Sequence, residues 1–131
     1  MSVPTVLIVE DYPAGMLVTT FLIEHLGYAV EQAYTGAEAI EKVRTAPEPF
    51  LAILMDVNLD DMDGFAVTTA IRALERENGF SIPIIAVTAH ALAGDRERCL
   101  KAGMDDYISK PIHPDILAQK LAALANATSV V

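Results

Sequence analysis

The sequence predicts an α/β protein with a doubly wound, five-stranded parallel sheet in the order 2-1-3-4-5, accompanied by five helices. Short apolar runs alternate along the chain with longer segments of helical spacing, the pattern of a parallel sheet covered by helices on both faces. Glycines stand between these segments, where helices and turns begin and end. Right-handed crossovers leave few other topologies for such a chain.

Three of the apolar runs, Thr5–Val9, Leu51–Asp56 and Ile84–Thr88, are nearly continuous, as expected for strands buried on both faces. The run Ala29–Ala33 is weaker and indicates an edge strand, and Tyr107–Lys110 supplies the last strand. The helices between the strands are predicted over Ala14–Leu26, Ala37–Arg44, Phe65–Glu77, Ala91–Ala102 and Pro114–Ala125.

Length and composition indicate one domain over residues 1–131, with a core at about 4–125 and a frayed tail at 126–131. The single cysteine, Cys99, excludes an intrachain disulfide and fits a reducing, cytoplasmic environment. No basic leader is present, and no apolar run approaches the roughly 20 residues of a membrane span. The net charge of −9 argues against binding to nucleic acid or to an anionic membrane.

Part of this negative charge is concentrated after two of the predicted strands. Because the carboxyl ends of parallel strands share one edge of the sheet, Glu10, Asp11 and Asp56 should converge there. Converging carboxylates repel one another unless a divalent cation neutralises them. Oxygen ligands favour Mg²⁺, with Mn²⁺ as the alternative, and the backbone carbonyl of Asn58 could add a further oxygen. The acidic residues are Glu10, Asp11, Asp56, Asp60, Asp61 and Asp63.

The fourth and fifth strands end near a hydroxyl, Thr88, and an ammonium group, Lys110. A carboxylate nucleophile, a metal, a hydroxyl and a lysine together make up the equipment of phosphoryl transfer. Each signal alone is weak, because an aspartate after a strand is often a cap or turn residue and Lys-Pro is often a plain turn. Their joint placement at four strand ends is far more specific.

On these residues the chain resembles the receiver domain of two-component response regulators, which has a flavodoxin-like, CheY-like fold. The resemblance covers nearly the whole chain. The matching stretches are Val6-Leu-Ile-Val-Glu10-Asp11, Ile53-Leu-Met-Asp56 with Met62-Asp63-Gly64, Pro83-Ile-Ile-Ala-Val-Thr88-Ala89, and Ala102-Gly-Met-Asp-Asp-Tyr107-Ile-Ser-Lys110-Pro111.

The resemblance implies that Asp56 is a phosphoacceptor, which takes a phosphoryl group from a histidine kinase or a histidine phosphotransfer protein. Glu10, Asp11, Asp56 and the Asn58 carbonyl would hold Mg²⁺. Thr88 and Lys110 would bind the phosphoryl oxygens, and the Lys110–Pro111 bond would be cis. Such a protein is a signalling phosphoacceptor rather than an enzyme, since it catalyses only its own phosphorylation and dephosphorylation.

The same resemblance implies a switch in which Thr88 moves toward the phosphoryl group and Tyr107 turns inward. The fourth helix, fifth strand and fifth helix would then present a changed surface to a downstream protein partner. The protein itself is expected to be a monomer or a weak homodimer. The fourth helix should be the least firmly packed, since its large apolar residues are mainly Leu92 and Leu100. The stretch from His90 to Met104 is similar to receivers of hybrid sensor kinases and of stand-alone regulators, and the starting Met and short tail favour the stand-alone form.

Two departures from the family pattern predict altered kinetics: Asp60 stands where proline is frequent, and Tyr12 where a small polar residue is frequent. Unchanged kinetics in Tyr12→Asn and Asp60→Pro would refute this expectation. Two other function classes stay open. A haloacid-dehalogenase-type phosphatase would carry an aspartate where this chain has Asn58, and a receiver-like scaffold that no longer phosphorylates would not need the intact acceptor set.

Overall fold

The computed structural model describes residues 3–57, 59, 63–89 and 95–129. Its elements alternate strictly between strand and helix along the chain. The strands are β1 (Thr5–Val9), β2 (Ala29–Ala33), β3 (Ala52–Asp56), β4 (Ile84–Thr88) and β5 (Asp106–Ser109). The helices are α1 (Pro13–His25), α2 (Gly36–Thr45), α3 (Gly64–Asn78), α4 (Asp95–Lys101) and α5 (Pro114–Ser129).

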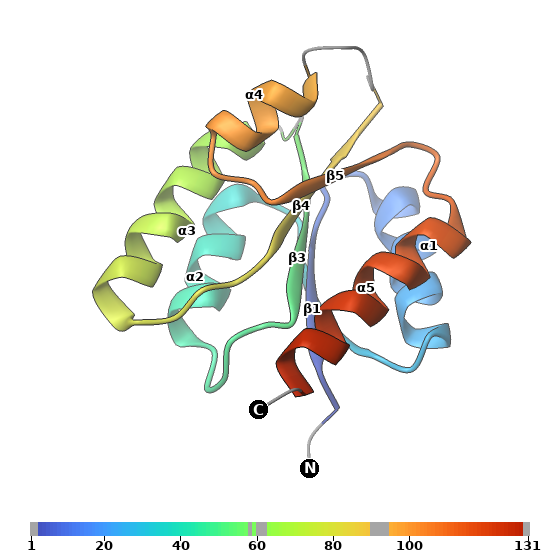
Figure 1. Ribbon diagram of the computed structural model, residues 1–131. Helices are drawn as coiled ribbons and strands as arrows, with labels where there is room; N and C mark the ends of the chain where they lie inside the picture. The colour runs from blue at the N-terminus through green and yellow to red at the C-terminus, as the bar shows by residue number, and fades with distance from the viewer. Residues whose placement is uncertain (1–2, 58, 60–62, 90–94, 130–131) are drawn as a thin grey trace.

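All neighbouring strands pair in parallel, in the order β2-β1-β3-β4-β5, so the predicted fold class and strand order are confirmed. Helices α2, α3 and α4 cover one face of the sheet, and α1 and α5 cover the other (Figure 1). Because all pairs of neighbouring strands are parallel, every strand runs in the same direction, and all carboxyl ends meet at one edge of the sheet.

Two apolar cores lie on the two faces because successive residues of a strand point to opposite sides. Leu7 and Val9 of β1 enter the core beneath α2 and α3, and Val6 and Ile8 enter the core beneath α1 and α5. The central strands β3 and β4 are buried along their whole length. This explains why their sequences are continuously apolar.

Side-chain caps fix the starts of two helices. The Thr35 hydroxyl accepts from the Glu38 amide at 3.0 Å before α2. The Asp63 carboxylate accepts from the Ala66 amide at 2.7 Å before α3. The second cap matters most here, because α3 begins beside the end of β3.

One prediction about the helices needs correction. Helix α5 continues to Ser129 instead of ending at Ala125, because its alanine-rich last turns contain no glycine or proline to stop it. In α4, Leu100 is 45% exposed, and the helix packs on the core through Cys99, which is buried. Leu92 and the first residues of the predicted helix lie outside the described part of the chain. Among the described residues, no helix has the length and apolar character needed to cross a bilayer.

Candidate active site

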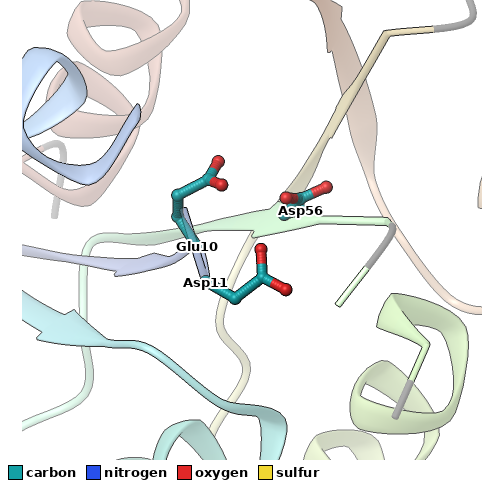
Figure 2. Close-up of side chains that lie close together, drawn as sticks. All are labelled: Glu10, Asp11 and Asp56. Carbon is teal, nitrogen blue, oxygen red and sulfur yellow. The ribbon is translucent and has the colours of Figure 1, made fainter. Parts of the chain in front are cut away.

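Three carboxylates meet at the carboxyl edge of the sheet. Glu10 and Asp11 directly follow β1, and Asp56 is the last residue of the adjacent strand β3. One carboxylate oxygen from each lies within 4.8 Å of the other two, and Figure 2 shows the three side chains close together. The predicted convergence of these residues is therefore confirmed.

Burial disfavours the charged forms of these carboxyl groups. Glu10 is 6% exposed and Asp56 is 4% exposed, while Asp11 is half-buried at the rim. Glu10 is held from its own backbone, because its amide donates to the Ala33 carbonyl at 3.0 Å. Its carboxylate accepts from the Tyr12 amide at 3.1 Å, at the start of α1. The chain thus aims the Glu10 carboxylate at the site by main-chain hydrogen bonds on both sides.

Lys110 reaches this edge from the residue after β5 and contacts two of the carboxylates. Its Nζ lies 3.3 Å from Glu10 Oε2 and 3.3 Å from Asp56 Oδ2. The Lys110 amide donates to the Thr88 carbonyl at 2.7 Å, which fixes the start of the side chain beside the end of β4. The sequence predicts Lys110 across the site from Asp56, and the structure adds Glu10 as its second partner.

The charges shift the protonation of these groups in a consistent way. Burial, and then repulsion from Asp56, raise the pKa of Glu10 above its ordinary value. Burial opposes the charged form of Lys110, but attraction to Asp56 and Glu10 outweighs it, so the pKa of Lys110 is raised. The site therefore holds excess negative charge that one ammonium group offsets only in part.

Some of the remaining predicted site residues lie in the part of the chain that the structure describes, and others lie outside it. Thr88 is buried at the end of β4, and Tyr107 is half-buried on β5 against the core under α3. The Lys110–Pro111 bond is cis. Tyr12 is largely exposed, and its backbone amide rather than its ring contacts Glu10. The predicted residues outside the described part of the chain are Asn58, Asp60, Asp61 and His90.

Gly64 is a site residue that sequence reasoning treated only as a helix boundary. A Cβ at Gly64 would lie 2.6 Å from the Asp56 carbonyl oxygen and 2.9 Å from Val57 Cα. The Gly64 amide also donates to the Val57 carbonyl at 2.9 Å. Helix α3 can therefore begin directly against the backbone of Asp56 only because residue 64 has no side chain.

The carboxylate set fits a hard divalent cation. Its donors are oxygens from three separate carboxylates, two of them buried, and no nitrogen or sulfur ligand takes part in the described cluster. Such a set is typical for Mg²⁺, which binds few carboxylates and keeps several waters. By contrast, a cavity of about 1090 Å³ opens at the amino ends of β1 and β2, the opposite end of the sheet, so it takes no part in this site.

Fold and site together define a doubly wound domain with a carboxylate cluster at the sheet edge, and comparison with known proteins gives its family. The family model described as the response regulator receiver domain matches residues 6–122. The chain therefore belongs to the response regulator receiver domain family.

Three similar proteins illustrate the match. The sensor protein GacS of Pseudomonas syringae pv. syringae is 45% identical over 120 residues, which cover 88% of this chain and 13% of that protein. The receiver domain of sensor histidine kinase PA1611 from Pseudomonas aeruginosa is 40% identical, with a TM-score of 0.83, and covers 95% of this chain and 99% of that one. That crystal structure holds a magnesium ion in the active-site cleft.

A third neighbour is the receiver domain of the Saccharomyces cerevisiae response regulator Ssk1, solved in complex with the histidine phosphotransfer protein Ypd1. It is 26% identical with a TM-score of 0.88, and the match covers 100% of this chain and 96% of that one. The present chain spans about an eighth of the length of GacS and of similar curated sensor kinases.

Proposed function

We propose that this receiver domain accepts one phosphoryl group on Asp56 from a phosphohistidine donor, and that the altered domain signals to a protein partner. The observation that carries this proposal is the buried Asp56 carboxylate, which lies beside two further carboxylates and is contacted by Lys110 at 3.3 Å. A structural aspartate would gain nothing from two like charges, whereas a phosphoacceptor needs both a metal-binding set and a cation for the phosphoryl oxygens.

In the proposed transfer, an Asp56 carboxylate oxygen attacks phosphorus and forms the new O–P bond. The P–N bond to the donor imidazole breaks at the same time, and the imidazole nitrogen keeps that electron pair and takes up a proton. The attacking group is a carboxylate oxygen, which needs no separate base to activate it. Lys110 would then move from Asp56 to the phosphoryl oxygens, and the buried Thr88 hydroxyl would donate to another of them.

Glu10, Asp11 and Asp56 are the residues that would hold Mg²⁺. When bound, the cation would offset the negative charge of the carboxylates and of the transferring phosphoryl oxygens. Lys110 meanwhile bridges Glu10 and Asp56 and offsets part of their charge, so the site stays assembled before the donor arrives.

The proposed output runs through Thr88 and Tyr107 to the surface of α4, β5 and α5. Thr88 ends β4, and Tyr107 lies on the neighbouring strand, half-buried between the core and solvent. A half-buried ring on an edge strand can take either an inward or an outward position at small cost, as a population switch requires.

The decisive experiment is intact-mass measurement after incubation with acetyl phosphate and Mg²⁺. We expect a gain of one phosphoryl group, absent in Asp56→Asn and without metal. Asp63→Asn is the matched control, because it alters a nearby carboxylate that caps α3. A folded wild-type protein that gains no mass with either acetyl phosphate or a phosphorylated donor protein would favour the scaffold alternative.

For the donor protein, we propose a docking surface on α1. This helix begins two residues after Asp11 and exposes an apolar patch of Leu17, Val18 and Phe21, with Leu17 71% and Phe21 67% exposed. An unpartnered apolar patch on a helix typically marks a protein interface. Its position beside the acidic site suits a partner that must bring a phosphohistidine to Asp56, and the Ssk1 receiver was solved with such a partner.

The test separates docking from chemistry. In Phe21→Ala and Leu17→Ser, labelling by acetyl phosphate should match wild type, while transfer from a histidine phosphotransfer protein should slow by about tenfold or more. Leu100→Ala, an exposed leucine on α4, is the control and should affect neither reaction. Equal transfer rates in all three variants would place the donor elsewhere.

A further inference from the structure

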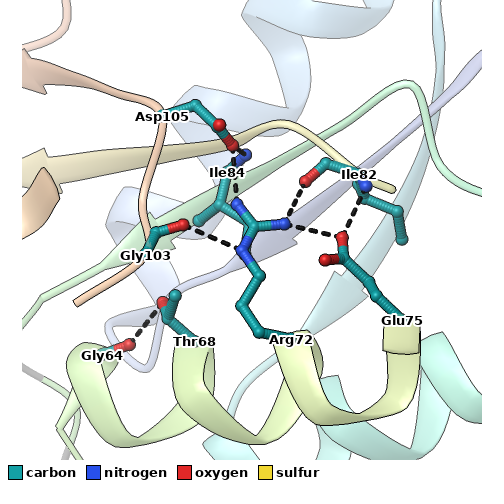
Figure 3. A network of polar contacts seen from close by, with 8 residues as sticks. All are labelled: Gly64, Thr68, Arg72, Glu75, Ile82, Ile84, Gly103 and Asp105. Carbon is teal, nitrogen blue, oxygen red and sulfur yellow. Dashed lines mark hydrogen bonds and ion pairs between the residues drawn. The ribbon is translucent and has the colours of Figure 1, made fainter. Parts of the chain in front are cut away.

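A half-buried arginine, Arg72, joins α3 to the loop between α4 and β5. Arg72 uses its whole guanidinium group, and Figure 3 shows its contacts converging from three segments. Nε donates to the Gly103 carbonyl at 2.8 Å, and Nη1 donates to the Ile82 carbonyl at 2.8 Å. Nη1 also pairs with Glu75 at 2.6 Å, and Nη2 pairs with Asp105 at 2.7 Å. These five residues are called the Arg72 cluster below.

The cluster supports the main chain as well as the side chains. Glu75, itself buried, accepts from the Ile82 amide at 2.6 Å. The Asp105 carboxylate accepts from the Ile84 amide at 2.8 Å, while the Asp105 amide donates to the Ile84 carbonyl at 2.8 Å. The start of β4 and the approach to β5 are thus tied to each other and to α3.

The end of α4 is closed by its own backbone before Arg72 reaches it. Gly103 has φ +103°, its amide donates to the Leu100 carbonyl, and the Met104 amide donates to the Cys99 carbonyl. This is the Schellman ending, and its expected apolar contact is met because Cys99 and Met104 are both buried in the same core. Gly103 also lies close to α3, where a Cβ would sit 3.4 Å from Arg72 Cγ.

Helix α3 connects this fixed end to the phosphoacceptor. It begins at Gly64 against the backbone of Asp56, and the Thr68 hydroxyl donates to the Gly64 carbonyl at 2.8 Å within its first turn. One turn further on, Arg72 donates a hydrogen bond to the Gly103 carbonyl in the loop between α4 and β5. The acceptor strand and the end of α4 are therefore held by one continuous helix.

We propose that the Arg72 cluster is the fixed pivot of α4, so that phosphorylation moves this helix about its C-terminal end and leaves the Gly103–Asp105 loop in place. The inference rests on the proposed phosphorylation of Asp56 and adds the point about which the output surface turns. Arg72 acts here as a positioning residue, because it touches neither Asp56 nor the carboxylates around it.

The test is amide hydrogen exchange followed residue by residue by NMR, on the whole protein with and without acetyl phosphate and Mg²⁺. In wild type, the amides of Gly103, Met104 and Asp105 should keep their exchange rates on phosphorylation, while amides of α4 and β5 change theirs. Equal changes in the loop and in α4 would overturn the pivot.

Arg72→Lys is the informative variant, since it keeps a positive charge beside Glu75 but loses the planar fork. We expect exchange of the three loop amides to rise about tenfold before phosphorylation, because charge-assisted hydrogen bonds are lost, and to respond to phosphorylation afterwards. Arg76→Lys, exposed on the same helix, should leave them unchanged. Asp105→Asn, which keeps an acceptor for Ile84, should shift them in the same direction by less.

Unaltered loop exchange in Arg72→Lys would overturn the proposal outright. A wild-type protein that takes no phosphoryl group would instead overturn the proposed function and with it any pivot in switching. Even then, faster loop exchange in unphosphorylated Arg72→Lys would show that Arg72 anchors the end of α4, so the two failures are distinguishable.

Discussion

Replacement of Gly64 by alanine should damage stability and phosphorylation together. The new Cβ would lie 2.6 Å from the Asp56 carbonyl oxygen, against at least 3.4 Å in ordinary van der Waals contact, so the two backbones must part by roughly 0.8 Å. Both sides of this contact are main chain, one of them the end of a buried strand, and neither can retreat as a flexible side chain would.

Forced packing of this kind costs about 1–3 kcal/mol. The smaller conformational entropy of alanine in the unfolded chain returns about 0.4–1 kcal/mol. We therefore expect the free energy of unfolding to fall by about 1–2 kcal/mol in urea titration. Because a misplacement near 1 Å in a reacting group costs up to about a hundredfold, the initial rate of acetyl phosphate labelling should fall by about ten- to a hundredfold.

Gly79→Ala is the matched control. Gly79 ends the same helix with φ +74° and has no neighbour within 4 Å of a new Cβ, so alanine there costs about 1–2 kcal/mol of backbone strain without touching the site. The two variants should lose similar stability, while only Gly64→Ala should lose labelling rate. Equal labelling rates in the two folded variants would refute the contact argument.

Three further predictions concern charge and capping. The raised pKa of Glu10 lets the folded protein keep this proton above pH 4.5, where the unfolded chain has lost it. Without Mg²⁺, stability should therefore fall as the pH rises from 4.5 through the folded pKa, and Mg²⁺ should raise Tm more at neutral pH than at pH 4.5; a pH-independent gain would contradict this. Lys110→Met should lower the free energy of unfolding of the Mg²⁺-free protein by about 1–2 kcal/mol, a modest value because the Lys110 side chain is partly exposed. The same variant should enlarge the rise in Tm that Mg²⁺ causes. A smaller rise than in wild type would show that Lys110 does not compete with the cation. Asp63→Ala should cost about 1 kcal/mol in urea unfolding through loss of the α3 cap, and no change in midpoint would mean that water replaces the carboxylate.

Local sequence determined the strands and the meeting of the carboxylates. Continuous apolar runs specify buried parallel strands, and parallel strands necessarily bring their carboxyl ends to one edge. The sequence alone therefore predicts that Glu10, Asp11 and Asp56 lie together, with Thr88 and Lys110 on the same edge of the sheet. The end of α5 does not follow from the sequence, because no local stop signal marks it and the helix continues through its alanine-rich last turns.

Tertiary structure alone decided which long-range partners each polar group found. From the sequence alone, Arg72 would be taken for a surface residue on an amphipathic helix. Its partners Gly103 and Asp105 lie 31 and 33 residues away along the chain. The contact of Gly64 with the Asp56 backbone, and the choice of Glu10 as a second partner for Lys110, likewise depend on distances between elements. Periodicity and turn chemistry act over a few residues, so they determine which elements form and where they end. Whether a side chain reaches a distant carbonyl depends on the positions of the helices on the sheet. Those positions are determined only when the whole core packs.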